Sequence, residues 1–340
     1  MKEKILFMGT PPIARTMLER LVSEGYEIVG VLTQPDRRVG RKKQLQCSAV
    51  KEYALQQGLP IWQPARIRDD HEELLKVEMD LIVTCAYGQF VPQALLDHPR
   101  FGAVNLHASL LPKLRGAAPI QRAIMRGDKE CGMSVMRMVK KMDAGAVMAQ
   151  RALRIEEEDT SGTLFEKLAV LGADLMASSL PLIFAGEADF VEQDEEQVSF
   201  APAITPQEER LDLCKGLDAV YDQARALIPQ PCGYIMHEGK KVKLHAVRRL
   251  HKAHDLAEGT CAGMIEHGFA IALQGGYLLA QKLCMVVASF FDRAFAGRHA
   301  AHHVRSRKGR SRWTRPPSIM EAASSGSAAA SNELVILLCN

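Results

Sequence analysis

Residues 4–32 read KILFMGTPPIARTMLERLVSEGYEIVGVL, and this stretch decides the fold class. Residues 5–8 and 28–32 are short runs of apolar, β-favouring residues, which predicts two strands. The residues between them show the i, i+3, i+4, i+7 spacing of an amphipathic helix, which Gly25 can end. The apolar positions of this helix are Ala14, Met17, Leu18 and Leu21. A strand, a helix and a second strand in this order predict a parallel sheet covered by helices.

Further strands are expected at 81–85, 103–106 and 133–138, which extends this pattern to an open, mostly parallel, Rossmann-like α/β sheet. Such sheets bind ligands at the carboxyl ends of their strands. The turn after the first strand, Gly9-Thr10-Pro11-Pro12, lacks the later glycines of a dinucleotide-binding loop. A nicotinamide or flavin dinucleotide is therefore disfavoured.

The second half of the chain changes character. A helix is expected to start at Thr160 or Ser161, with one apolar face made of Leu164, Leu168, Leu171 and Leu175. Beyond it, residues 185–206 are acidic and weakly periodic, like a linker. A short helix at 220–227 and strands at 233–237, 241–247 and 269–273 then predict a small β-rich second domain.

Composition is that of a folded protein with about two domains: 340 residues, 47% hydrophobic and 24% charged. No signal peptide or membrane span is predicted, so we expect a cytoplasmic protein. The eight cysteines form no Cys-x-x-Cys pair, which disfavours a zinc or dithiol site. The tail from Met285 holds eight Lys/Arg and three Asp/Glu, which leaves 35 basic and 37 acidic residues before it. Any nucleic-acid contact must therefore come from a local cluster.

The densest polar group is Asn105-Leu106-His107, at the expected carboxyl end of a strand. Residues two apart on a strand point to the same side, so an amide and an imidazole would converge. Together they can hold an oxyanion and move a proton. A hydrogen-bonded structural pair is the alternative that the pattern alone leaves open.

Further motifs surround this pair. They are Gly9-Thr10-Pro11, Thr33-Gln34-Pro35-Asp36-Arg37, Ala86-Tyr87-Gly88-x-x-x-Pro92, Ser109-Leu110-Leu111-Pro112, Arg115-Gly116-x-x-Pro119 and Met142-Asp143-x-Gly145. Their order resembles the folate-dependent formyltransferases over roughly residues 4–280, and within them the members that act on methionyl initiator tRNA.

The resemblance implies a catalytic trio of Asn105, His107 and Asp143. It implies folate contacts from Ser109, Leu110, Leu111, Pro112, Tyr87, Gly88 and Gln89. The co-substrate would be 10-formyltetrahydrofolate, and no metal is implied. Taken alone, an Asp before Ala-Gly is typical of a turn, and Ala146 stands where the family commonly has a second Asp.

A basic loop follows the second strand, with five basic residues in seven: Arg37, Arg38, Arg41, Lys42 and Lys43. A solvated surface loop is the ordinary interpretation of such a run. The resemblance implies instead that it enters the acceptor stem of the tRNA, where it would neutralise phosphates.

The expected organisation is a catalytic domain at 1–188, a linker at 189–206 and a β-barrel domain that supports the tRNA at 207–284. The tail at 285–340 is basic and then Ala/Ser-rich, and the family's last strand is not recognisable in it. This change indicates a shifted reading frame, appended residues or a lineage-specific tail.

The expected function is transfer of a formyl group from 10-formyltetrahydrofolate to methionyl initiator tRNA, by a monomer with no membrane contact. One alternative is a formyltransferase acting on a small amine, such as a sugar nucleotide or glycinamide ribonucleotide, which would not need the basic loop. Another is an inactive tRNA-binding module, against which Asn105, His107 and Asp143 argue.

Overall fold

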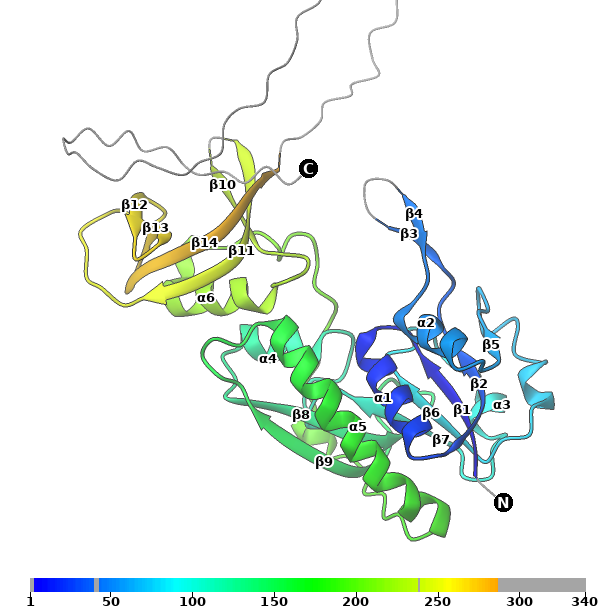
Figure 1. Cartoon of the computed structure of the whole chain (residues 1–340). Helices are drawn as coiled ribbons and strands as arrows, with labels where there is room; N and C mark the ends of the chain where they lie inside the picture. Colours follow the sequence, from blue (N-terminus) through cyan, green and yellow to red (C-terminus); the bar gives the residue numbers. More distant parts are fainter. Residues whose placement is uncertain (1–2, 40–42, 238, 287–340) are drawn as a thin grey trace, which may run out of the picture.

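The computed structural model describes residues 3–39, 43–237 and 239–286. Two domains lie one above the other in Figure 1, with the chain passing from the first to the second after α5. The predictions for Arg41, Lys42 and the tail fall outside these residues, apart from 285–286, which belong to the last strand.

The first domain is built on a seven-stranded sheet of order β5-β2-β1-β6-β7-β8-β9. The first five strands in this order pair in parallel, whereas β8 is antiparallel to β7 and β9 to β8. The predicted mostly parallel sheet is confirmed. The strands are β1 (Lys4–Gly9), β2 (Glu27–Leu32), β5 (Ile61–Trp62), β6 (Leu81–Cys85), β7 (Ala103–His107), β8 (Glu130–Arg137) and β9 (Val147–Arg154).

Helices cover this sheet on both faces, and α1 and α5 lie side by side on one of them (Figure 1). The four predicted apolar positions of α1 are fully buried, so this face provides the contact with the sheet. The helices of the domain are α1 (Pro12–Ser23), α2 (Ala49–Gln56), α3 (Gln93–Leu96), α4 (Pro119–Met125) and α5 (Ser161–Ala185), with a 3-10 turn at Leu74–Lys76.

The long helix α5 begins after Thr160, as predicted. The Thr160 hydroxyl accepts a hydrogen bond from the backbone N–H of the third helical residue, which satisfies one of the free donors of the first turn. Of the predicted apolar face, Leu164, Leu168 and Leu175 are buried and Leu171 is half-buried. This face packs against β8 and β9.

Among the described residues, α5 is one helix that is long and apolar enough to cross a membrane by length and composition. Half of its most apolar 18-residue window is buried inside the protein. A core helix of a globular domain has the same properties, so the expected lack of membrane contact remains a prediction.

Two short strands that the sequence did not predict, β3 (Arg37–Val39) and β4 (Gln44–Gln46), form a hairpin that projects from the first domain on the side of the second (Figure 1). The base of the hairpin is anchored by Asp36. Its carboxylate accepts hydrogen bonds from Lys51 Nζ at 2.7 and 2.9 Å and from Gln63 Nε2 at 2.9 Å. These bonds, that from Gln63 first, lower the pKa of Asp36.

The second domain is an antiparallel sheet of order β10-β11-β14-β13-β12, packed against α6 (Leu217–Ala226). Its strands are β10 (Tyr234–His237), β11 (Lys240–Leu250), β12 (Cys261–Ile265), β13 (Gly268–Leu273) and β14 (Gly276–Val286). The predicted small β-rich domain is confirmed, although the sequence analysis did not predict β12 and β14.

The segment between the domains runs along the first domain. It carries 3-10 turns at Glu195–Gln197 and, nearer the second domain, at Leu213–Lys215. The backbone of Phe200 is paired in a β-bridge with that of Arg115. The two domains also meet directly, because the buried Arg225 guanidinium donates to the carbonyl of Asp159 at 2.7 Å. The predicted linker therefore has fixed contacts with the catalytic domain.

Candidate active site

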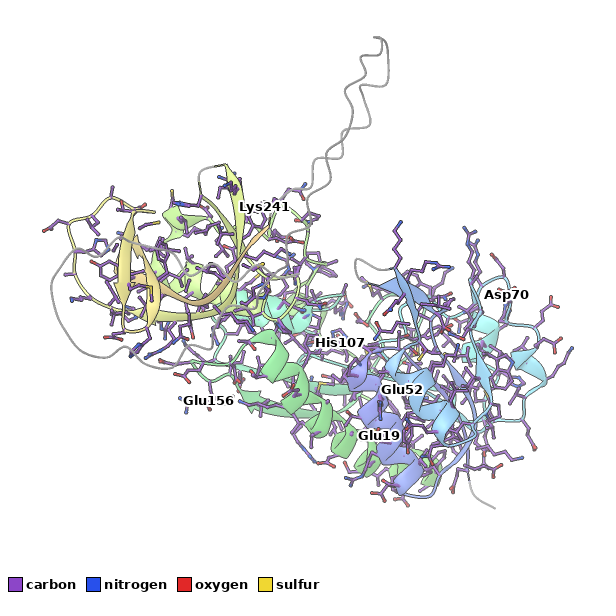
Figure 2. All side chains as sticks on the ribbon, turned by 45° about the horizontal axis from the view of Figure 1, so that its top comes forward. Glu19, Glu52, Asp70, His107, Glu156 and Lys241 are labelled. Atoms are coloured by element: carbon purple, nitrogen blue, oxygen red, sulfur yellow. The ribbon has the colours of Figure 1, made fainter. Side chains whose placement is uncertain are left out.

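Asn105 and His107 lie at the carboxyl end of β7, on the same side of the strand, as their spacing predicts. In Figure 2 His107 lies on the side of the first domain that is turned toward the second domain. The loops after β1, β2 and β6 leave the parallel strands at this same edge of the sheet. The site is thus where a Rossmann-like sheet binds its ligands.

Thr84 on the neighbouring strand β6 orients the amide of Asn105. Its hydroxyl donates a hydrogen bond to Asn105 Oδ1 at 2.7 Å, and Thr84 is buried. Within the described part of the chain, no acceptor is paired with Asn105 Nδ2. The half-buried amide therefore presents an N–H donor, the group that a developing oxyanion requires. Sequence analysis did not identify Thr84, because its position opposite Asn105 follows from the parallel pairing of β6 with β7 and not from a local pattern.

His107 is buried, with one ring nitrogen engaged by the backbone. Its Nε2 lies 3.1 Å from the carbonyl oxygen of Leu114. A carbonyl can only accept, so Nε2 carries the hydrogen of this bond. Nδ1 is therefore the ring nitrogen that faces the site, and it lies 3.7 Å from Asp143 Oδ1.

Asp143 lies in the loop between β8 and β9, in a left-handed conformation with φ of 50°. Its Oδ2 accepts a hydrogen bond from the backbone N–H of Gly116 at 2.8 Å. The side chain is 17% exposed, which leaves it open to a ligand yet largely shielded from water. Asp143 thus has a turn conformation and also lies near His107.

This loop has to run back along the sheet to reach His107. In the antiparallel pairing of β7 with β8, Arg137 lies opposite Val104, three residues before His107. At about 3.3 Å per residue, the hairpin turns about 10 Å from His107. The return path is tight at Gly145, where a Cβ atom would lie 2.0 Å from the carbonyl oxygen of Arg137. Only glycine fits there.

Gln193 holds the same loop from the segment between the domains. Its Nε2 donates to the carbonyl oxygens of Asp143 and Gly145 at 2.8 and 2.7 Å. Its Oε1 accepts from Nε of Arg115 at 3.0 Å, and Arg115 also donates to Glu195. Sequence analysis did not identify Gln193, because it assigned this segment to a linker.

The four residues predicted to bind folate after β7, Ser109, Leu110, Leu111 and Pro112, form the turn that follows His107. Ser109 and Leu111 are buried, and the Ser109 hydroxyl donates to the carbonyl of Lys113 at 2.6 Å. Ser134 donates to the carbonyl of Ser109 at 2.6 Å, and Gln150 donates to that of Leu111 at 2.8 Å. These bonds fix the turn, and a ligand there would meet mainly its backbone.

The second predicted folate segment, Tyr87, Gly88 and Gln89, follows β6. The carbonyl of Tyr87 accepts hydrogen bonds from the Thr10 hydroxyl at 3.0 Å and from Gln34 Nε2 at 3.1 Å, so three of the motifs converge here. The Tyr87 ring is buried in the core, and burial raises its pKa to about 12. Its hydroxyl has no partner among the described residues. Gln89 is tied by its side chain to the loop after β5, and Gly88 has a left-handed backbone.

The described residues of the basic loop, Arg37, Arg38 and Lys43, are exposed on the β3–β4 hairpin. The Arg38 guanidinium donates to the carbonyl of Lys43 at 3.2 Å, which closes the hairpin. Within the described residues, none of these three cations forms an ion pair with a carboxylate. Their charges are therefore available to an anionic partner.

Two cysteines of the first domain lie in its core. Cys85 and Cys131 are buried, and burial raises the pKa of their thiols to about 12 and about 11. Both are therefore protonated, apolar residues of the core. Among the described residues, no three His, Cys, Asp or Glu side chains are close enough to hold a metal ion.

Comparison with known proteins identifies the family of both domains. The formyl transferase family model matches residues 2–180, and the model of the formyl transferase C-terminal domain matches residues 203–287. The methionyl-tRNA formyltransferases of Bacillus cytotoxicus and Lactobacillus gasseri are each 43% identical to this chain, over 270 and 274 residues. These matches span 79% and 80% of this chain and 86% and 87% of those proteins.

The solved structure of an N-formyltransferase from Helicobacter canadensis, in complex with folinic acid and dTDP-3-aminofucose, shares the fold with a TM-score of 0.64. It is 18% identical, and the match covers 83% of this chain and 99% of that one. Two family models and close relatives span both domains and a solved structure shares the fold, so the chain belongs to the formyl transferase family, among its methionyl-tRNA formyltransferases.

Proposed function

We propose that the protein transfers the formyl group of 10-formyltetrahydrofolate to the α-amino group of methionine carried by initiator tRNA. The observation that carries the proposal is the approach of Asp143 Oδ1 to within 3.7 Å of His107 Nδ1, near the Asn105 amide, whose Nδ2 has no acceptor among the described residues. The relatives that are methionyl-tRNA formyltransferases cover both domains and support the same substrate.

The chemistry requires an oxyanion donor and a proton carrier. The amine nitrogen bonds to the formyl carbon, and the bond from that carbon to the folate nitrogen then breaks. Asn105 Nδ2 donates to the oxygen that becomes negative in between. His107 Nδ1 takes the proton that the amine loses and returns it to the departing folate nitrogen. Asp143 stabilises the imidazolium that exists between these two steps.

The folate would bind between the two segments that follow β6 and β7. The turn at 109–112 and the loop at 86–92 leave neighbouring parallel strands at the edge where His107 lies. Ser109 and Gln89 are already paired within the protein, and the Tyr87 hydroxyl is buried, so the pterin would be held by backbone groups and by shape. The folate is a consumed co-substrate, and the expectation that no metal takes part remains a prediction.

The tRNA would be held by the β3–β4 hairpin. Arg37, Arg38 and Lys43 project away from the domain without acidic partners among the described residues, which favours a polyanionic substrate over a small amine. The hairpin rises on the side of the first domain where His107 and the second domain lie (Figures 1 and 2). A bound acceptor stem could therefore bring its aminoacyl end to the imidazole.

Formylation of charged initiator tRNA by the purified chain tests the proposal. The chain is incubated with 10-formyltetrahydrofolate and methionyl initiator tRNA, and formylmethionine is measured after hydrolysis of the ester. His107→Ala should abolish turnover, whereas the exposed His98→Ala should not. Formylation of a dTDP-amino sugar or glycinamide ribonucleotide in place of the tRNA would overturn the proposed substrate. Tight tRNA binding without any transfer would identify an inactive binding module instead.

A further inference from the structure

The loop that carries Asp143 is partly exposed, and its Lys141 forms an ion pair with Glu195 at 2.9 Å. Val139 and Met142 are 44% and 50% exposed, and Asp143 itself adopts a left-handed backbone conformation. The loop must also run back along the sheet to reach His107. Other parts of the chain must therefore hold it in this position.

Gln193 supplies that contact through both hydrogens of its amide. Nε2 donates to the carbonyl oxygens of Asp143 and Gly145, at 2.8 and 2.7 Å, and so spans the turn on both sides of Ala144. A single side-chain group that binds two carbonyls of one turn fixes the turn's backbone, and with it the direction of the Asp143 side chain.

Arg115 in turn fixes Gln193. Its side chain is fully buried, and its Nε donates to Gln193 Oε1 at 3.0 Å, while both terminal nitrogens donate to Glu195 Oε1 at 3.1 Å. The next residue along the chain, Gly116, donates its backbone N–H to Asp143 Oδ2. The hydrogen bonds form a closed ring in which residues 115–116 position both the amide and the carboxylate.

We infer that Gln193 is a positioning residue that holds the Asp143 carboxylate against His107 through the Asp143 and Gly145 carbonyls. The inference rests on the proposed function, because it assumes that Asp143 takes part in formyl transfer. It gives the segment between the domains a part in catalysis that its sequence does not indicate. Gln193 has no contact with the reacting atoms and acts only through the loop.

Two substitutions separate this role from simple packing. Gln193→Ala removes the hydrogen bonds that the amide donates to the loop and the one that it accepts from Arg115. Gln193→Glu keeps an oxygen acceptor for Arg115 and adds an attractive charge, but it sets a carboxylate oxygen against two carbonyl oxygens. A residue that mattered only as the partner of Arg115 would therefore tolerate Glu. A residue that clamps the loop would not.

The experiment measures kcat and KM for formylation of methionyl initiator tRNA, together with Tm, for both variants. We expect kcat to fall about 10- to 100-fold in both, with KM for each substrate within about threefold of the unmodified chain. The matched control is Gln197→Ala, four residues away, whose exposed side chain bonds only Asp194 among the described residues. It should retain full kcat.

The outcomes distinguish the inference from the function on which it rests. If the unmodified chain formylates the tRNA but Gln193→Glu keeps its kcat, the inference is wrong and the proposed function stands. A loss of kcat equal in Gln193→Ala and Gln197→Ala would also overturn the inference, since the effect would belong to the whole segment. If the unmodified chain transfers no formyl group to tRNA, the proposed function itself fails.

Discussion

Replacing Asp143 by Asn removes a charge while keeping the shape of the site. Asn tolerates the left-handed conformation at this position as Asp does, and its side-chain oxygen can accept the hydrogen bond from Gly116. The substitution removes the electrostatic attraction between the Asp143 carboxylate and the His107 imidazolium, 3.7 Å away. The free energy of this attraction is about 1 kcal/mol in water and about 4.5 kcal/mol at an effective dielectric constant of 20. Bound substrates exclude water from the site, so the effect should approach the higher value.

At about tenfold in rate per 1.4 kcal/mol, kcat should fall about 10- to 1,000-fold. Single-turnover formylation with both substrates saturating measures this step without the contribution of binding. The control is Asp97→Asn, because Asp97 is an exposed carboxylate that bonds the side chain of Gln93 one helical turn away. If Asp143→Asn formylated tRNA as fast as the control, the carboxylate would have no electrostatic part in the reaction and the reasoning would be refuted.

Three further predictions follow from other contacts. Thr84→Val should lower kcat about tenfold in steady-state assays, because the Asn105 amide loses the hydroxyl that orients it. This loss is smaller than that expected from removing an oxyanion donor altogether. An unchanged kcat would show that the amide does not need this hydrogen bond. Arg37→Ala combined with Lys43→Ala should reduce the slope of log K for tRNA binding against log salt by about 2, measured by titration at several salt concentrations, and an unaltered slope would exclude phosphate contacts by these residues. Glu208 accepts hydrogen bonds from Arg122, which lower its pKa from the usual 4.5 to about 2. Glu208 therefore binds a proton more readily in the unfolded chain than in the folded one. Its ionised carboxylate stabilises the fold above about pH 4.5, and this stabilisation is lost as the pH falls toward 2. Glu208→Gln should lower the free energy of unfolding by about 1 kcal/mol at pH 7, after allowance for solvent screening, and by less at pH 3, as measured by urea unfolding. An equal loss at the two pH values would show that the ionised Glu208 carboxylate does not stabilise the fold.

The elements that sequence analysis predicted correctly carry a local signal, and several of those it missed do not. The strands β1 and β6 consist mainly of consecutive apolar residues, and the apolar residues of α1 recur at the spacing of one helix face. In contrast, β5 has only two residues, and α2 buries only Val50 and Ala54. The edge strand β9 is half-buried or exposed along its whole length, so it lacks the alternation that marks a strand. Such elements exist because their neighbours pair with them.

The same distinction applies to the site. Asn105 and His107 lie on one strand, so their spacing alone predicts that they share a face. Asp143 and Gln193 reach the site through tertiary contacts, the first to Gly116, 27 residues away, and the second to Arg115, 78 residues away. No local pattern encodes contacts at this separation. The resemblance to a family supplied Asp143, and nothing in the sequence analysis supplied Gln193.

Because Asn105 and His107 lie on one strand whereas Asp143 is held by long-range contacts, the two groups depend on different lengths of the chain. The sheet alone holds Asn105 and His107, because β7 is paired with a neighbour on both sides. The loop of Asp143 is hydrogen-bonded by Gln193. Gln193 lies beyond residue 188, the predicted end of the catalytic domain, and beyond residue 180, where the match to the N-terminal family model ends. A chain cut at either point would keep the amide and the imidazole but would lose both hydrogen bonds to the loop. The predicted linker is therefore part of the active-site scaffold by its contacts, and a boundary drawn from the extent of the sheet divides the site.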